Sequence, residues 1–310
     1  MNLDFRGLIP ATVLPMTEDA RIDEAGLRRY LQHVVAAGPK ALAINADTGE
    51  GMHLWPEERR RVLEIVVDEV GDRVPVIAGL GAQFTEQAVK LAKEYKDAGA
   101  AGFLVFPISA YQGQPLDPEV PVRYHAAIGD ATGLPLVLFN LQPSLGGVLY
   151  PPETLHRLCQ VAEVGAIKEA SFDAKLFVEA REAVKAARPD CVFLTGNDNF
   201  IYESFVLGAE GALIGFGAVA TRPQVEMIEH ALEGNHAEGS AIMDTLTPLA
   251  FAIFAAPVRN YRARAKEALV MQGILERATV REPLLPVSEA EKDRVREAMV
   301  LAGELEPVAA

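Results

Sequence analysis

The chain has 310 residues, of which 50% are hydrophobic and 23% charged, a composition that is ordinary for one large globular domain or two small ones. Its formal net charge of −14 disfavours binding to nucleic acid or to anionic membrane surfaces. No apolar run approaches the roughly 18 residues of a membrane span, and the first residues do not resemble a secretory signal. Cys159 and Cys191 lie in apolar segments and are expected to be reduced core residues rather than a disulfide pair. We therefore expect a cytoplasmic protein without a nucleic-acid or membrane partner.

Short apolar runs alternate with longer amphipathic segments along the first three quarters of the chain. The first run is followed by a segment in which Leu27, Leu31 and Val34 recur at helical spacing. Strands are predicted at residues 8–15, 41–47, 74–81, 102–108, 135–141, 164–170, 191–197 and 211–217. Helices are predicted at residues 22–38, 55–71, 85–99, 116–131, 151–162, 173–187, 199–208 and 222–234.

This alternation predicts the fold class. The strands are continuous apolar runs, which indicates a parallel sheet covered on both faces. Eight strand–helix units over about 230 residues are typical of a (β/α)8 TIM barrel. A doubly wound sheet is the alternative, but the first strand–helix turn carries neither G-x-G-x-x-G nor a Walker sequence. We expect the barrel to occupy residues 1–235.

The remaining residues, 236–310, break the alternation. They are predicted to form about three helices without intervening strands, near residues 237–255, 257–275 and 288–303. We expect them to be a C-terminal helical extension packed on the barrel.

One lysine stands where a barrel carries its chemistry, at the C-terminal end of a strand. Lys168, in the stretch VGAIKEAS, is the one lysine inside a predicted barrel strand. Burial lowers the pKa of a lysine, and a neutral amine attacks carbonyl carbon to give a Schiff base. The structural alternative is a buried ion pair with Asp47 or Glu50.

The turn after the second predicted strand, DTGEG at residues 47–51, is a candidate anion site. Successive backbone N–H groups in such a turn can surround an anion, and Thr48 adds a hydroxyl donor. The carboxylate of a keto acid would fit between this turn and Lys168, although an ordinary loop is the alternative. Gly215 and Gly217 leave the wall of the last strand bare, which either admits a bulky substrate or satisfies packing.

Several motifs resemble the dihydrodipicolinate synthase/N-acetylneuraminate lyase family, in consistent order over about residues 5–300. TGEGMHLWPEER (48–59) looks like that family's T-G-E-x-x-x-L-x-x-E-E-R signature, and Lys168 in GAIKEAS is similar to its Schiff-base lysine. GNDNFIYESFVLGAEGALIG (196–215) resembles its G-x-D segment followed by L-G-x-x-G-x-I-S.

The resemblance implies a class I lyase, an aldolase or dehydratase, that needs no cofactor or metal. Pyruvate or a 2-keto-3-deoxy acid would form an iminium with Lys168, and the enzyme would be a homotetramer built as a dimer of dimers. Substrate contacts are expected at Thr48, Gly49, Phe139, Asn140, Gly196, Asn197 and Ile214.

The chain also departs from the family pattern, as a divergent member. The family's fifth strand ends in Tyr-Asn-x-Pro, and its tyrosine shuttles a proton, but Phe139 stands there in this chain. Tyr111 and a protonated Asp47 are the candidate replacements. Leu145 takes the place of an arginine of true dihydrodipicolinate synthases, which argues against that reaction. A catalytically impaired keto-acid-binding barrel is therefore the alternative function, and a metal-dependent lyase that uses strand-end carboxylates is a third.

Overall fold

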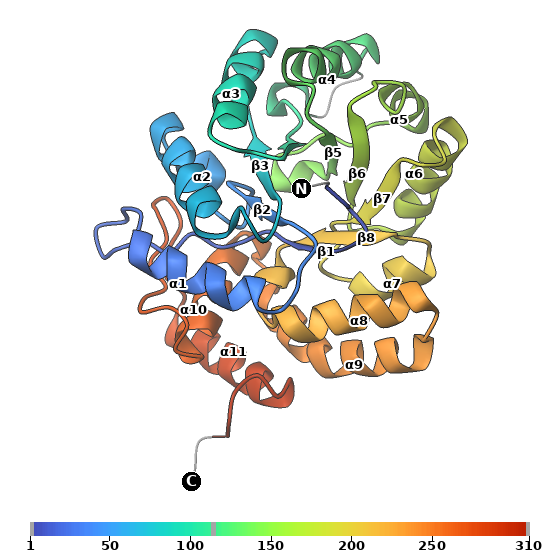
Figure 1. Ribbon diagram of the computed structural model, residues 1–310. Helices are drawn as coiled ribbons and strands as arrows, with labels where there is room; N and C mark the ends of the chain where they lie inside the picture. Colours follow the sequence, from blue (N-terminus) through green and yellow to red (C-terminus); the bar gives the residue numbers. More distant parts are fainter. Residues whose placement is uncertain (1–2, 113–115, 308–310) are drawn as a thin grey trace.

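The computed structural model describes residues 3–112 and 116–307, in which eight parallel strands form a nearly closed barrel (Figure 1). The strands are β1 Gly7–Pro10, β2 Leu42–Ile44, β3 Val76–Leu80, β4 Gly102–Val105, β5 Leu136–Leu141, β6 Val164–Ala170, β7 Val192–Thr195 and β8 Gly211–Ile214. Sheet order is β1-β8-β7-β6-β5-β4-β3-β2, and an isolated parallel bridge between Ala11 and Ala43 joins β1 to β2. The predicted (β/α)8 barrel is thereby confirmed.

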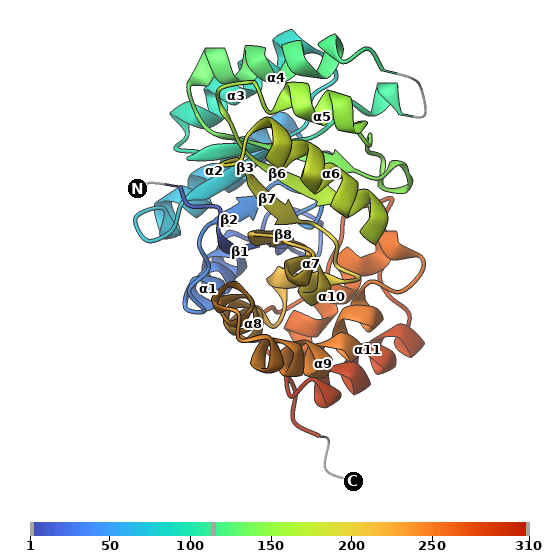
Figure 2. The ribbon, with the colours of Figure 1, turned by 90° about the vertical axis from the view of Figure 1, so that its right-hand side faces the viewer.

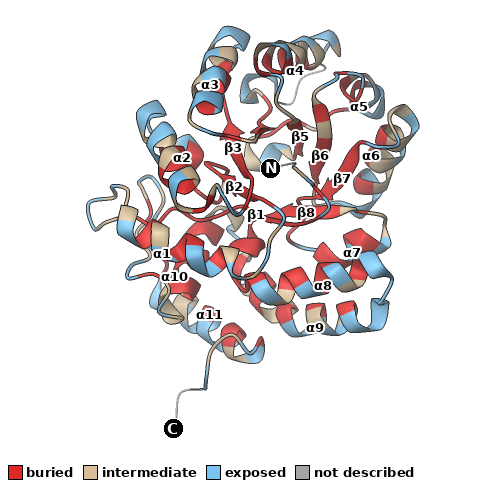
Figure 3. Ribbon diagram, in the orientation of Figure 1, coloured by how far each residue is buried: buried red, intermediate tan, exposed pale blue. Residues whose placement is uncertain are grey.

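Eight helices surround the barrel and turn their buried faces toward the strands (Figure 3). In α3, for example, Ala88, Leu91, Ala92 and Tyr95 recur at helical spacing and are buried. These helices are α1 Glu24–Val35, α2 Pro56–Val70, α3 Thr85–Asp97, α4 Glu119–Thr132, α5 Pro152–Leu158, α6 Ala174–Ala187, α7 Ile201–Val206 and α8 Thr221–Glu233. Short 3-10 helices are η1 Gly51–His53, η2 Ser109–Tyr111, η3 Pro143–Leu145, η4 Phe216–Ala218 and η5 Val258–Asn260.

Several predicted strands were too long at their C-terminal ends. The run at residues 8–15 covers β1 from its second residue but continues through buried Val13 and Leu14, which pack outside any strand. The run at 211–217 likewise extends past β8 into the 3-10 helix η4. Apolar residues mark burial, and burial at the mouth of the barrel does not require strand pairing.

The two faces of each strand pack against different apolar layers. In β6, Ile167 belongs to the layer between the strands and the outer helices, whereas Ala166 and Ala170 belong to the cluster inside the barrel. Because side chains alternate along a strand, Lys168 shares the inward face with Ala166 and Ala170. The barrel therefore directs this lysine into its interior.

The C-terminal extension consists of α9 His236–Ile253, α10 Tyr261–Met271 and α11 Glu289–Leu301. Helix α9 packs against α8, and α11 packs against α9 and α10 (Figure 2). Helix α10 carries three cations that are at most 3% exposed, Arg262, Arg264 and Lys266. They pair with Asp47, Glu291 and Glu50, respectively. Two of these carboxylates belong to the turn after β2, so the extension is fastened to the barrel mouth.

Two further sequence expectations concern the membrane and the thiols. Of the helices in the described ranges, none is by itself long and apolar enough to cross a membrane; α9 and the segment Val258–Met271 pass only as a pair, bent by 106°. Cys159 and Cys191 are buried free cysteines, as expected.

Candidate active site

Lys168 lies near the C-terminal end of β6, between Phe139 of β5 and Leu194 of β7 in the sheet register. Its side chain is 7% exposed and lines a cavity inside the barrel mouth. A Cβ atom on Gly196 would lie 2.5 Å from Lys168 Cε, so the glycine after β7 leaves the room that the lysine stem occupies. The predicted inward lysine and the glycine beside it are thus part of one site.

The Lys168 amine is desolvated but not paired. Burial lowers its pKa to about 8, and the negative charges of Asp198 and Asp47 oppose this shift. Within residues 3–112 and 116–307, no carboxylate oxygen lies within 4.0 Å of Lys168 Nζ and no hydrogen bond reaches it. The amine instead lies over the Phe139 ring, 4.2 Å from its centroid. The alternative of an ion pair with Asp47 or Glu50 is not what the structure contains.

Asp198 is the carboxylate that lies deepest in this cavity. It is 7% exposed, and its Oδ1 accepts a hydrogen bond of 2.8 Å from the backbone N–H of Phe216. Burial raises its pKa to about 6, against the opposing effects of that hydrogen bond and of Lys168. Asp198 thus lines the same cavity as Lys168.

The turn after β2 has the free donors that an anion site needs. The backbone N–H groups of Thr48 and Gly49 donate to no acceptor in the described parts of the chain. Glu50 adopts a left-handed conformation at φ 55°, and its carboxylate is held by Lys266 and by the backbone N–H of Arg281. The conformation of the turn is therefore fixed from the extension, while two N–H groups stay available.

Asp47 is held among groups of the extension. Its carboxylate pairs with Arg262, accepts the Tyr261 hydroxyl at 2.9 Å and lies 3.6 Å from Arg259 Nη1. Its backbone oxygen accepts from Arg262 Nε at 2.6 Å. A carboxylate between two guanidinium groups acts as a hydrogen-bond acceptor. The sequence suggested Asp47 as a proton carrier, and the structure places it as the acceptor of these hydrogen bonds from the extension.

Tyr261 is the site residue that the sequence did not indicate. It is the first residue of α10, is 5% exposed and lines the same cavity as Lys168. Its hydroxyl lies 3.2 Å from Thr48 Oγ1 in addition to its contact with Asp47. A phenol is thus present beside Lys168, although it comes from the extension and not from β5.

The structure gathers about half of the predicted site residues around Lys168. The residues that line its cavity include Asp47, Thr48, Phe139 and Gly196, whereas Gly49, Tyr111, Asn140, Asn197 and Ile214 do not.

The predicted residues that do not line the cavity include two amides with hydrogen-bond partners in the protein and a tyrosine that lies at a different hollow. Asn140 Oδ1 accepts from the Tyr150 N–H at 2.8 Å, and Asn197 Nδ2 donates to Glu169 Oε2 at 2.8 Å. Tyr111 is 38% exposed and lines a separate hollow with Tyr150. These amides hold loops at the barrel mouth, and Tyr111 does not reach the lysine.

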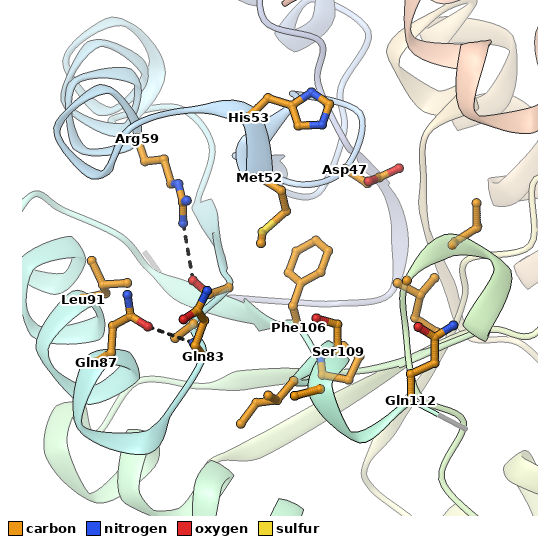
Figure 4. A pocket seen from close by; sticks show the side chains of 18 of the residues that line it. Asp47, Met52, His53, Arg59, Gln83, Gln87, Leu91, Phe106, Ser109 and Gln112 are labelled. Atoms are coloured by element: carbon orange, nitrogen blue, oxygen red, sulfur yellow. Dashed lines mark hydrogen bonds between the residues drawn. The ribbon is translucent and has the colours of Figure 1, made fainter. Parts of the chain in front are cut away.

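A larger cavity of about 840 Å³ adjoins the Lys168 cavity, and Asp47, Leu141 and Leu145 line both (Figure 4). Its volume is in the range of small-molecule sites, which is roughly 300–1,000 Å³. One carboxylate, that of Asp47, and three guanidinium groups line it; the guanidinium groups belong to Arg59, Arg259 and Arg262. In a protein of net charge −14, this wall is locally positive and favours an anionic occupant.

Arg259 lies beside the loop of Leu145, the residue that takes the place of an arginine of true dihydrodipicolinate synthases. A Cβ atom on Gly146 would be 3.3 Å from Arg259 Nη2, and Gly146 directly follows Leu145. Among the described residues, no group of three or more His, Cys, Asp or Glu side chains is arranged to hold a metal ion.

The fold and these side chains define a (β/α)8 barrel protein with a desolvated lysine at the C-terminal ends of its strands. The sequence profile of the Dihydrodipicolinate synthetase family matches residues 4–301. The chain therefore belongs to this family, whose members are lyases of the aldolase or condensing type.

Individual relatives agree with this assignment. The 4-hydroxy-tetrahydrodipicolinate synthase of Escherichia coli (strain K12) is 32% identical over 299 residues, which cover 96% of this chain and 99% of the relative. The protein of the same name from Nitrobacter hamburgensis is 34% identical over 96% of this chain and 97% of the relative. The chloride-inhibited dihydrodipicolinate synthase from Acinetobacter baumannii, solved in complex with pyruvate, has a TM-score of 0.87 at 27% identity, over 97% of this chain and 100% of that one.

Proposed function

We propose that the protein is a class I lyase, an aldolase or dehydratase, in which Lys168 forms an iminium with pyruvate or a 2-keto-3-deoxy acid. The observation that carries this proposal is the unpaired, buried amine of Lys168, whose pKa is lowered to about 8. A neutral amine is the nucleophilic form, and at neutral pH this lysine is deprotonated far more often than one in water. The pyruvate complex of the Acinetobacter baumannii relative supports a keto acid as ligand.

The turn after β2 supports the same ligand. In the proposal, the free N–H groups of Thr48 and Gly49 bind the keto-acid carboxylate, while the keto carbon faces Lys168. Phe139 and Gly196 form the apolar walls beside the amine. Water leaves on iminium formation. The iminium then accepts the electrons of the bond that is broken, or it loses a proton from the neighbouring carbon to give the enamine that attacks.

Reduction with sodium borohydride in the presence of pyruvate tests this proposal directly. We expect intact-protein mass spectrometry to show one added pyruvyl group per chain after reduction, and peptide mapping to place it on Lys168. The same experiment with larger 2-keto acids ranks the substrates. A folded protein that gives no adduct with any of them would contradict the proposal and favour a barrel that binds keto acids without turnover.

The pH dependence of adduct formation is the second expected result. The rate should rise with pH with a midpoint near 8 and level off at higher pH, because half of the Lys168 amine is neutral at its pKa and nearly all of it is neutral well above that value. The charge of Asp198 raises the pKa of Lys168 more than that of Asp47 does. Asp198→Asn removes this charge, so the midpoint should move to lower pH. Borohydride trapping at a series of pH values measures both midpoints, and a shift to higher pH would contradict the assignment.

We propose that the second reactant, or the far end of a longer keto acid, lies in the 840 Å³ cavity and carries an anionic group. The support is the excess of arginines on its wall and the position of Arg259 beside Gly146. Leu145 argued against dihydrodipicolinate synthesis because an arginine is missing there, but Arg259 brings a guanidinium group next to Gly146, the residue that follows Leu145. Condensation of pyruvate with aspartate semialdehyde is therefore an assay to include beside the proposed lyase reactions.

Arg259→Met gives the expected result for this part of the site. The variant should raise KM for an anionic aldehyde by about 10-fold or more, because a charge-assisted hydrogen bond contributes about 1.5–3 kcal/mol. The rate of the pyruvate adduct at Lys168 should not change. Succinic semialdehyde, which is anionic, and glycolaldehyde, which is uncharged, are the two reactants to compare. An equal increase in KM for both would contradict the proposal that Arg259 binds an anionic group of the reactant.

The assembly and the compartment stay predictions. The homotetramer is an inference from the family resemblance, which sedimentation of the purified protein tests. The cytoplasmic location is inferred from the buried free cysteines and the composition.

A further inference from the structure

Phe139 cannot transfer a proton, so one step of the proposed reaction needs another side chain to do so. Attack of an amine on a keto group makes an alkoxide that must be protonated, and its oxygen must later leave as water. The resembled family places a tyrosine at the end of β5 for proton transfer, but the Phe139 ring has no exchangeable proton. Among the described residues that line the Lys168 cavity, two carry a hydroxyl group, Thr48 and Tyr261. Tyr261 supplies the phenol, from the start of α10 in the C-terminal extension.

The surroundings of Tyr261 hold its ring in one position. Phe254 stacks on it, with ring centroids 4.8 Å apart and planes inclined by 17°. A Cβ atom on Gly215 would lie 3.0 Å from Thr48 Oγ1 and 3.2 Å from Tyr261 Cε2. The bare glycine after β8 therefore makes room for the contact between these two side chains, which decides the open question of Gly215 in favour of packing.

The hydrogen bonds around the phenol have a defined direction. A carboxylate can only accept, so the Tyr261 hydroxyl donates to Asp47 and its oxygen accepts from the Thr48 hydroxyl. Rotation about the C–O bond turns the same proton toward an oxygen bound near Lys168. Burial, followed by the charge of Asp47, raises the pKa of Tyr261 well above its usual value, so the group is a phenol that can donate.

On the basis of the proposed function, we propose that Tyr261 is the catalytic residue that transfers protons during Schiff-base formation at Lys168. The Lys168 nitrogen bonds to C2 of the keto acid, the C2=O electron pair moves to oxygen, and that oxygen takes the Tyr261 proton. The nitrogen then returns one proton to the phenolate. In the second half, Tyr261 protonates the hydroxyl, water leaves and the iminium forms. The phenolate then regains a proton from solvent. This proton balances the one that the Lys168 ammonium group released to solvent before the amine attacked.

The time course of borohydride trapping with pyruvate alone tests this role without knowledge of the second substrate. Tyr261→Phe should slow adduct formation by about 10²–10⁴-fold, the usual contribution of a general acid. The final fraction of labelled Lys168 should equal that of the parent protein, because a proton-transfer residue changes the rate and not the equilibrium. Phe139→Tyr in the Tyr261→Phe background should restore the rate at least 10-fold, since it returns a phenol to the cavity from β5.

Tyr95→Phe is the matched control. Tyr95 is buried in α3 and does not line the Lys168 cavity, so removal of its hydroxyl should leave the trapping rate with pyruvate unchanged. An unchanged rate in Tyr261→Phe would overturn the inference while the adduct on Lys168 still upheld the proposed function. A final fraction that falls with the rate, without rescue by Phe139→Tyr, would show that Tyr261 is a structural residue. A parent protein without any adduct would remove both proposals.

Discussion

Lys168→Met should abolish the borohydride-reducible adduct with pyruvate and reduce turnover to background. Methionine fills the same space with an unbranched, uncharged chain, so the cavity keeps its shape while the nucleophile is lost. Peptide mass spectrometry after reduction measures the adduct, and an enzyme assay with the keto acid that labels the parent best measures turnover. Treatment of the parent with EDTA should not change its activity, which separates the proposed lyase from a metal-dependent one.

The variant should remain at least as stable as the parent, and this makes the loss interpretable. The pKa of Lys168 is 10.5 in water and about 8 in the folded chain, so the folded state binds the proton less tightly. This disfavours folding by about 3 kcal/mol at pH values below 8, and the effect disappears as pH rises past the value of the unfolded chain. Methionine removes this cost at pH 7. Urea unfolding measures the difference, and residual adduct on another lysine of a fully folded variant would contradict the assignment of Lys168.

The barrel and its lysine were predictable because both are written in local sequence. Strand β6 spans residues 164–170, as predicted. A continuous apolar run is typical of a strand that is buried on both faces, and only the pair Lys168–Glu169 interrupts this run. A lysine in such a run must be paired or functional, and its inward direction follows from the alternation of side chains.

The groups that come from the extension were not predictable in the same way. Tyr261 and Arg259 lie more than 200 residues after Thr48 and Asp47, and no local pattern connects a helix start in the extension with a turn after β2. The sequence Arg262-Ala-Arg264-Ala-Lys266 nevertheless carries a signal for buried cations. Arg262 and Lys266 lie on one face of the helix and Arg264 lies on roughly the opposite face, which is unlike the single polar face of a surface helix. Such a helix must place some of its cations against buried carboxylates.

The amides at the strand ends make hydrogen bonds that the sequence did not predict. Asn140 and Asn197 stand at the C-terminal ends of β5 and β7, where side chains often contact a substrate. Asn140 accepts from the Tyr150 N–H and Asn197 donates to Glu169 on β6, because a buried amide needs partners whether or not a ligand is present. Position in the barrel predicted which edge they would reach, but not the hydrogen bonds that already occupy them.

The ion pair between Glu50 and Lys266 is expected to be the strongest single link between the barrel mouth and the extension. Both side chains are 0% exposed, the N–O distance is 2.5 Å, and Lys266 Nζ also donates to Thr279 O at 2.7 Å. Lys266→Met should lower the free energy of unfolding by about 3–5 kcal/mol, because it leaves the Glu50 carboxylate buried without its cation. Urea unfolding of the purified variant measures this loss.

The double variant Glu50→Gln/Lys266→Met shows whether the loss comes from charge or from packing. Replacing both members of a buried ion pair by neutral groups of similar size is often nearly neutral, so the double variant should recover most of the lost stability. Glu64→Gln is the matched control, because Glu64 pairs with Arg60 on the exposed face of α2 and its loss should be too small to measure. If the double variant is as unstable as Lys266→Met alone, the link depends on packing. If it recovers, the loss in Lys266→Met comes from the unpaired Glu50 carboxylate, and this carboxylate can be buried in the left-handed turn next to the anion site only with a cation from the C-terminal extension.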